Sequence, residues 1–243
     1  HTLTIKATDM EGKSSTANVA FSKVSPYTKL FDGEVFYMPF DGDLMEMISF
    51  QFANKVGTPS FSDGGILDSK AYLGAAGGYL TFPLEGLNNP EFSAAMWVKI
   101  NASPDRSGIL NVSPAGENRT KGFRLFREGN VSLQRIKLNV GTGSGETWND
   151  GAELQVNGEW VHLAGVYTGS KVNMYVNGVL KGTSTGTIAG NIVNNGSPLT
   201  MAFKTATNID YFNGKMDEVG VFNQALTAAQ IQAYLGTSLV GSE

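Results

Sequence analysis

The residues Val172-Asn173-Met174-Tyr175-Val176-Asn177-Gly178-Val179 decide the fold class of this chain. Val172, Met174 and Val176 occupy every second position, so they share one face of an extended strand. Asn177-Gly178 follows at once, and this dipeptide is favoured in two-residue type I′ turns because both central residues need a positive φ. The stretch therefore predicts an antiparallel hairpin with strands over 172–176 and 179–183.

Most of the chain around this hairpin has the same character. From about residue 34 onward, short apolar stretches are separated by turns rich in Gly, Asn and Ser. Further strands are predicted at 35–40, 79–82, 92–100, 107–112, 122–126, 131–140, 160–167, 199–203 and 211–222. Short strands at this spacing indicate an all-β fold, a two-sheet antiparallel jelly-roll sandwich. The alternation within 131–140 changes phase, which predicts a bulge near Gln134-Arg135.

One short helix is predicted near the end of the chain. Thr227 and Gln230 have the spacing of a capping box. Ile231, Tyr234 and Leu235 would form one apolar face, and Gly236 fits the position just past the end of the helix. So short a helix would not persist alone, so it is expected to pack on the sandwich.

The first 25 residues differ from the rest. Apolar residues alternate over 3–7 and 17–21 around a polar stretch at 9–13, which predicts a hairpin. Ala7-Thr8-Asp9 and the residues Gly-Lys-Ser-Ser at 12–15 resemble the last two strands of bacterial immunoglobulin-like modules. We therefore expect a hairpin of a truncated module over 1–25, a linker over 26–33, and the jelly-roll domain over 34–243.

Composition excludes several classes of function. The formal net charge is −4, so the basic surface that nucleic-acid binding requires is not expected. No apolar run approaches about 20 residues, so no membrane insertion is expected. Cysteine is absent and the two histidines include the first residue, which argues against a zinc site built from these ligands.

Six stretches occur in an order that resembles a known family. They are Phe-Asp-Gly-Asp at 40–43, Phe-Ser-Ala-Ala-Met-Trp-Val-Lys at 92–99, Gly-Glu-Trp-Val-His-Leu-Ala-Gly-Val-Tyr at 158–167, Met-Tyr-Val-Asn-Gly at 174–178, Phe-Asn-Gly-Lys-Met-Asp-Glu-Val-Gly-Val-Phe at 212–222 and Gln-Ala-Leu-Thr-Ala-Ala-Gln-Ile at 224–231. This order resembles the laminin-G-like domains of the concanavalin A-like lectin/glucanase superfamily. The resemblance implies two large antiparallel sheets, one of them concave, in extracellular or cell-surface proteins that handle glycans.

Members of that superfamily are enzymes, lectins or structural modules, so the fold alone does not assign a function. Glycosidases need two carboxylates facing each other across the bond that breaks. Asp217 and Glu218 are neighbours in a predicted strand and would point to opposite faces. We therefore expect no enzyme but a non-catalytic carbohydrate-binding module of a bacterial cell-surface or secreted protein, which captures or positions polysaccharide. The alternative is a structural or adhesion spacer that binds another cell-surface protein, and a glycoside hydrolase ranks third.

Three residues are candidates for binding a glycan. Trp148 lies in a polar loop, where it is either an exposed stacking platform or folded back over a sheet edge. Tyr211 is a second candidate aromatic, in a predicted turn. Arg124 shares a strand face with Phe126 and either hydrogen-bonds a sugar from the concave face or is simply a solvated charge. Trp97 and Trp160 lie in apolar strands and are expected in the core. His162 lies mid-strand and is expected in the core or against a sheet face.

The resemblance also implies a structural calcium ion. An Asp near the first strand and an Asp near the last can approach each other in related domains. Carried over to this sequence, the ligands are Asp41 and Asp217, with Asp43 or backbone carbonyls completing the shell. Hard cations take such oxygen ligands. The alternative is that Asp41-Gly42-Asp43 is only a turn, since Asp and Gly favour turns.

Overall fold

The computed structural model describes residues 2–20, 27–67, 70–74, 77–84, 87–101, 106–112, 119–129, 133–149, 151–155, 158–193, 196–202 and 211–240. The strands are β1 (Thr2–Thr8), β2 (Ser14–Ala20), β3 (Glu34–Met38), β4 (Asn54–Val56), β5 (Ser60–Asp63), β6 (Lys70–Gly74), β7 (Tyr79–Phe82), β8 (Phe92–Ile100), β9 (Ser107–Val112), β10 (Lys121–Gly129), β11 (Leu133–Thr142), β12 (Glu146–Trp148), β13 (Ala152–Gln155), β14 (Val161–Tyr167), β15 (Val172–Val176), β16 (Val179–Thr183), β17 (Leu199–Met201) and β18 (Gly214–Phe222). One helix, α1 (Ala228–Val240), follows the last strand.

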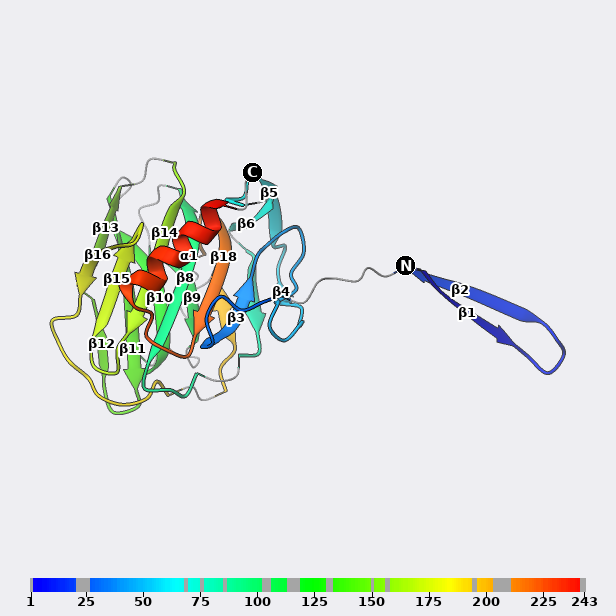
Figure 1. Ribbon diagram of the computed structural model, residues 1–243, viewed down its shortest axis with the longest axis horizontal. Helices are drawn as coiled ribbons and strands as arrows, with labels where there is room; N and C mark the ends of the chain where they lie inside the picture. The colour runs from blue at the N-terminus through cyan, green and yellow to red at the C-terminus, as the bar shows by residue number, and fades with distance from the viewer. Residues whose placement is uncertain are drawn as a thin grey trace.

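Two antiparallel sheets of eight strands each form a sandwich (Figure 1). In one, here called the β10 sheet, the strand order is β12-β11-β10-β9-β17-β7-β4, and β13 pairs with β11. In the other, the β14 sheet, the order is β16-β15-β14-β8-β18-β6-β5, and β3 pairs with β18. The predicted jelly-roll fold class is confirmed, because neighbours in both sheets are distant in sequence and all pairings are antiparallel.

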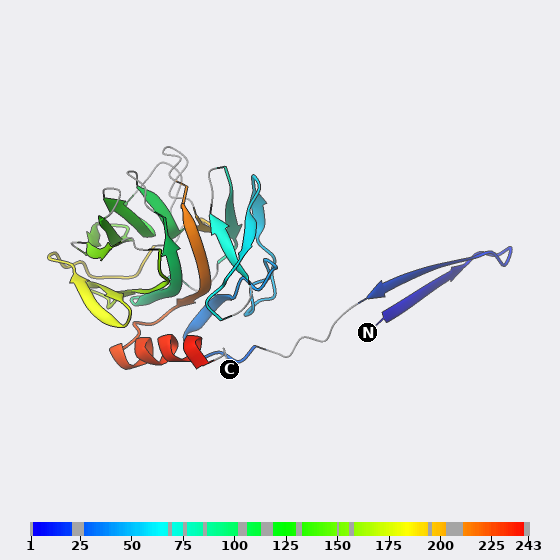
Figure 2. The same cartoon turned by 90° about the horizontal axis from the view of Figure 1, so that it is seen from above.

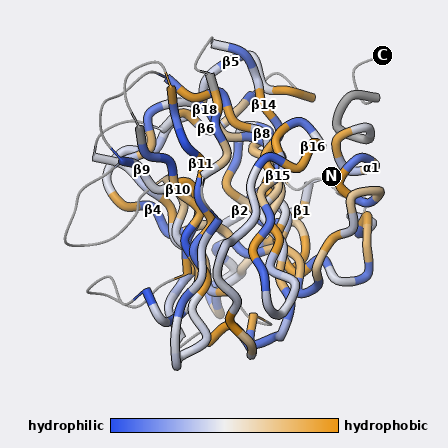
Figure 3. Tube along the Cα trace, turned by 90° about the vertical axis from the view of Figure 1, so that its left-hand side faces the viewer, coloured by the Kyte–Doolittle hydropathy of each residue, from blue (hydrophilic) through white to orange (hydrophobic). Residues whose placement is uncertain are grey.

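The core lies between the two sheets. Alternate residues of each strand point inward, such as Phe123 and Leu125 of β10 and Ile136, Leu138 and Val140 of β11. Apolar and polar residues accordingly alternate along the strands in Figure 3. The hairpin between β15 and β16 turns at Asn177 and Gly178, whose φ values of 49° and 74° confirm the predicted type I′ turn.

Helix α1 lies across the outer face of the β14 sheet (Figure 2). Leu226, Ile231 and Tyr234 pack there against Ala95, Ala164, Val166 and Phe222. The capping box is confirmed: Thr227 N–H donates to Gln230 Oε1 at 2.9 Å, and Gln230 N–H donates to Thr227 Oγ1 at 3.2 Å. No helix among the described residues is long and apolar enough to cross a membrane.

The N-terminal hairpin is confirmed as strands β1 and β2, which form a sheet of their own. All residues of both strands are exposed, and the hairpin stands apart from the sandwich in Figure 1. The described part of the expected linker, residues 27–33, instead contacts the sandwich. Leu30 and Phe31 pack against the cluster under α1, and the ring of Phe31 lies 6.1 Å from that of Phe222.

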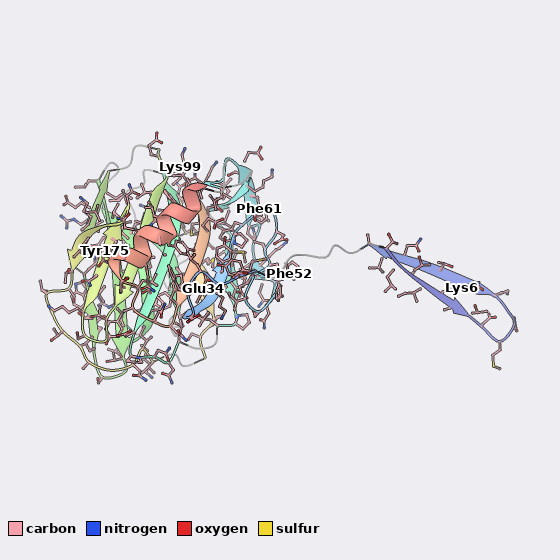
Figure 4. The ribbon with its side chains drawn as sticks, in the orientation of Figure 1. Lys6, Glu34, Phe52, Phe61, Lys99 and Tyr175 are labelled. Atoms are coloured by element: carbon pink, nitrogen blue, oxygen red, sulfur yellow. The ribbon has the colours of Figure 1, made fainter. Side chains whose placement is uncertain are left out.

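A buried carboxylate holds this segment in place. The Tyr27 hydroxyl donates to both Glu34 carboxylate oxygens, at 3.1 and 3.0 Å, and Leu30 N–H donates to Glu34 Oε2 at 3.1 Å. The rings of Tyr27 and Tyr37 stack with centroids 4.4 Å apart. Burial raises the pKa of the Glu34 carboxyl, which is fully buried at the start of β3 (Figure 4). These contacts fix the point where the chain enters the sandwich.

Three local predictions are wrong. The β10–β11 pairing is regular from Gln134 to Thr142, so no bulge lies near Gln134-Arg135. The phase changes because Gln134 is an inward-facing polar residue, whose Oε1 accepts from Nη1 of the buried Arg127 at 2.6 Å. Trp160 is half-buried and precedes β14, whereas Trp97 is 5% exposed, as expected. Helix α1 runs through Gly236 to Val240, because a glycine costs a helix only about 1 kcal/mol and does not by itself end it.

Candidate functional site

The outer face of strand β10 carries polar and aromatic side chains. Phe123 and Leu125 point into the core, so Arg124, Phe126 and Glu128 lie on the opposite face. This confirms the predicted division of the strand into two faces. A register shift at Leu125/Phe126 against β9 interrupts the ladder on one side of the strand.

One row of residues crosses the β10 sheet at this level. Trp148 of β12 is paired with Asn139 of β11, and Asn139 with Arg124 of β10. Arg124 is in turn paired with Asn111 of β9, and Asn111 with Thr200 of β17. Side chains of directly opposed residues lie about 4.5–5.5 Å apart at Cβ, so the row is a continuous line of polar groups with an indole at its end.

Hydrogen bonds hold the centre of this row. Arg124 Nη1 donates to Asn139 Oδ1 at 3.0 Å, and Asn139 Nδ2 donates to Glu146 Oε2 at 2.8 Å. Arg124 is 3% exposed and Asn139 4% exposed. A guanidinium whose neighbours fix its plane is preorganised to bind a planar acceptor.

Trp148 contributes the large aromatic surface. Its side chain is 46% exposed although it belongs to a strand. Trp148 and Arg124 border one pocket of about 310 Å³, at the lower end of the ~300–1,000 Å³ typical of small-ligand sites. The described residues that line it are Arg106, Arg119, Arg124, Phe126, Glu128, Lys137, Asn139 and Trp148. Two of the three residues predicted to bind a glycan therefore meet in one pocket.

Ion pairs order the other end of the pocket. Glu128 accepts from Lys137 Nζ at 2.5 Å and from Arg106 Nε at 3.3 Å. The Glu128 and Lys137 side chains are 20% and 19% exposed, so these charges are partly desolvated. They border the pocket alongside Phe126, which gives it both apolar and charged walls.

Tyr211, the third predicted ligand-binding residue, lies elsewhere. It is half-buried just before β18 of the β14 sheet, and it is not among the described residues that line the pocket. The residues preceding it, 203–210, lie outside the described part of the chain.

The three predicted calcium ligands do not gather into one group of carboxylates. Asp43 Oδ1 accepts from Met45 N–H at 2.9 Å, and Gly42 N–H donates to Phe40 O at 2.8 Å, which are turn contacts. Asp41 and Asp43 are exposed, whereas Asp217 is 1% exposed and accepts from Ile66 N–H at 2.7 Å. Within the described ranges, no three Asp, Glu, His or Cys side chains lie together as metal ligands. Backbone carbonyls would have to supply most of a calcium shell at Asp217.

His162 is buried as predicted, beneath helix α1. Its ring lies 5.4 Å from that of Trp97 and 5.8 Å from that of Tyr234. Neither ring nitrogen has a hydrogen-bond partner in the described part of the structure. Burial lowers the pKa of this imidazole to about 4, so the ring is neutral at pH 7 and packs against two aromatic rings.

A sandwich of two large antiparallel sheets with a polar, aromatic-edged pocket on one outer face defines a jelly-roll protein. Residues 73–232 match the family described as the concanavalin A-like lectin/glucanases superfamily, in its laminin-G-like branch. The chain therefore belongs to this superfamily, as its sequence motifs predicted. No curated protein matches it in sequence.

Solved structures share the fold. Domain 4 of AbnA, a GH43 extracellular arabinanase from Geobacillus stearothermophilus solved with arabinotriose, superposes with a TM-score of 0.63 at 21% identity, covering 83% of this chain and 98% of that one. The binding domain of Paraclostridial Mosquitocidal Protein 1 has a TM-score of 0.64 at 14% identity and covers 85% and 52%. The binding domain of Botulinum Neurotoxin DC with SialylT has a TM-score of 0.59 at 15% identity, again over 85% and 52%.

Sequence reasoning missed most of the pocket. It singled out Trp148 and Arg124 but gave no role to Glu128, Lys137 or Asn139. A signal was present in β11, where Arg135, Lys137 and Asn139 alternate with apolar residues. That signal assigns a face, but it does not show which residues of neighbouring strands lie opposite each other.

Proposed function

We propose that this domain binds carbohydrate without cleaving it, and that the pocket beside Trp148 is its binding site. The observation that carries the proposal is the row of residues Trp148, Asn139 and Arg124. The half-exposed indole of Trp148 lies at one end of this row, and the buried guanidinium of Arg124 lies at the other. Sugars present apolar C–H faces that stack on aromatic rings and hydroxyls that hydrogen-bond to planar polar groups. This row offers both within one pocket.

A binding role fits the carboxylates of the pocket better than hydrolysis does. Glu128 is the one carboxylate among the described lining residues, and it is held by Lys137 and Arg106. Glycosidases need a pair, about 5–10 Å apart. The arabinanase domain with arabinotriose and the neurotoxin binding domain with SialylT support glycan binding on this fold. We further propose that this chain is an extracellular or cell-surface module of a bacterial protein.

The test is a glycan array followed by calorimetric titration, with Trp148→Ala and a matched control, Leu180→Ala. Leu180 is 49% exposed on β16 of the other sheet, so its loss removes exposed apolar surface away from the pocket. We expect Trp148→Ala to weaken binding about 10-fold, the equivalent of about 1.4 kcal/mol of lost stacking. Leu180→Ala should bind like the wild type.

Two outcomes contradict this proposal in different ways. Binding that survives Trp148→Ala unchanged places the glycan elsewhere on the sandwich. Failure to bind any glycan favours the second candidate function, protein adhesion, for which exposed Phe50 and Phe52 would supply contact surface at 51% and 64% exposure.

A structural calcium ion at Asp217 forms the second part of the proposal. A carboxylate that is 1% exposed is well placed to accept a cation, with backbone carbonyls completing the shell. We expect a chelator to lower the melting temperature, because an ion bound only to the folded state stabilises it by about 2.7 kcal/mol at 100 times its Kd. Asp217→Asn should melt at the chelated temperature and lose sensitivity to the chelator. Identical melting curves of the wild type with and without chelator would contradict the proposed calcium site.

A further inference from the structure

The charge of the Trp148 pocket is opposite to that of the chain. The protein carries a formal net charge of −4. The described lining of the pocket nevertheless contains the four cations Arg106, Arg119, Arg124 and Lys137 against the single carboxylate of Glu128. A partly enclosed surface with one sign of charge concentrates ligands of the opposite sign.

Glu128 and Glu146 are two acids of the described residues on this face of the sheet, and each has a known partner. Glu128 is shared between Lys137 and Arg106 at one end of the pocket. Glu146 is one further acid on the same sheet face, and it accepts from the neutral amide of Asn139 at 2.8 Å. Among the described residues, the four lining cations therefore outnumber these two carboxylates.

Two further arginines of the described lining, Arg124 and Arg119, differ in burial. Arg124 is 3% exposed, and its Nη1 donates to the neutral Oδ1 of Asn139 at 3.0 Å. Arg119 is exposed in the turn before β10. A guanidinium donates two parallel hydrogen bonds to a carboxylate, an arrangement that no single sugar hydroxyl can accept.

We propose that the pocket is selective for an acidic glycan, in which a carboxylated sugar sits against Arg124 and Arg119 while its ring stacks on Trp148. This inference rests on the proposed function, because it names the ligand class of the same site. A sulfate ester shares the anionic chemistry, so the test separates the two groups. Neutral polysaccharide is the alternative ligand class.

The experiment compares each acidic glycan with a form that lacks one kind of anionic group; desulfated chondroitin keeps its uronate carboxylates and so isolates the effect of sulfate. Carboxylated probes are oligogalacturonate against its methyl ester and sialyllactose against lactose, and the sulfated probe is chondroitin sulfate against desulfated chondroitin. We expect at least one carboxylated member to bind at least 10-fold more tightly than its neutral counterpart. Its affinity should also fall several-fold between 50 and 500 mM salt, because salt screens partly exposed charges.

Three single-charge variants of the full chain then test the pocket. Arg119→Gln removes a lining cation and should weaken acidic-glycan binding about 3–10-fold. Glu128→Gln removes the lining carboxylate and should strengthen the same binding about 2–5-fold, a gain that mere damage to the fold would not produce. Lys181→Gln makes the same charge change as Arg119→Gln on exposed β16 of the other sheet, and it should leave affinity unchanged.

The outcomes are distinguishable. Equal affinity for acidic and neutral partners, with binding still lost in Trp148→Ala, overturns the acidic selectivity and leaves carbohydrate binding intact. Binding to chondroitin sulfate alone overturns the carboxylate assignment. Absence of binding to all acidic and neutral probes contradicts both this inference and the proposed function. Unchanged affinity in both Arg119→Gln and Glu128→Gln, with melting temperatures near that of the wild type, places the anion outside this pocket.

Discussion

His162 is a basic side chain kept neutral by its surroundings. It lies between Trp97 and Tyr234 with no exposed surface. Burial lowers the pKa of its imidazole from 6.5 to about 4, because the charged form would lose its hydration. The residue therefore links the packing of helix α1 to pH.

The sign of this link follows from proton counting. Between pH 6.5 and 4 the unfolded chain binds a proton at His162 and the folded chain does not, so the free energy of unfolding falls as the pH is lowered. Relative to pH 7, we expect a loss of about 2 kcal/mol from this residue at pH 4.5. Denaturant titration of the wild type and His162→Phe at both pH values measures it.

The variant is necessary because other groups titrate in the same window. Burial raises the pKa of the Glu34 carboxyl, which changes the free energy of unfolding in the opposite direction in both proteins. His162→Phe should therefore lose less on acidification than the wild type does. Equal losses in the two proteins would show that His162 is protonated in the folded state.

At the scale of elements, the β15–β16 turn is joined to helix α1. Gln232 Nε2 donates to the Gly178 carbonyl at 3.0 Å. A Cβ at Gly178 would lie 2.1 Å from that same nitrogen, and the residue has a φ of 74°. Glycine is thus favoured twice at this position: it suits the positive φ of the turn, and it leaves room for the Gln232 side chain.

Gly178→Ala should lower the free energy of unfolding by about 1–2 kcal/mol, through backbone strain and displacement of Gln232. In a Gln232→Ala background the same change should cost less, because the displaced side chain is absent while the strain remains. Gly158→Ala is the matched control: Gly158 precedes β14 in the sandwich and has a φ of 79°, with nothing within 4 Å of its added Cβ. Melting curves of the four variants test the coupling, and strictly additive costs would exclude it.

At the scale of the whole molecule, the N-terminal hairpin and the sandwich differ in how they are held. Within the described part of the chain, strands β1 and β2 form a sheet only with each other, and all of their residues are exposed. Residues 27–34 instead bring Leu30, Phe31 and the Tyr27–Glu34 hydrogen bonds onto the β14 sheet. The structural boundary of the sandwich therefore falls near Tyr27.

Two truncations test this boundary. A chain that begins at Tyr27 should melt at the temperature of the full chain. A chain that begins at Val35 should lose about 2–4 kcal/mol, because one or two large apolar side chains leave the surface of the sheet. Calorimetry distinguishes them, and equal melting of the two truncated chains would show that residues 27–34 do not stabilise the sandwich.

The candidate site was predictable only in part. Trp148 stood out because its loop is polar, and Arg124 because it alternates with Phe123 and Leu125. Lys137 and Asn139 could not be assigned to the same site from the sequence, because only the register between β10 and β11 shows that residues 124 and 139 lie side by side. Gln134 was misread for the same reason, because its partner Arg127 lies on the other strand.

The sequence by itself determined the features that depend on neighbours along the chain. These are the alternation that makes strands, the positive φ values of the Asn177-Gly178 turn and the capping box at Thr227. Only the tertiary structure decided which strands are adjacent and in what register, and hence that Trp148, Arg124, Glu128 and Lys137 share one pocket. The physical reason is that turns and caps are set by short-range sterics and hydrogen bonds, whereas register is set by the packing of a core contributed by the whole chain.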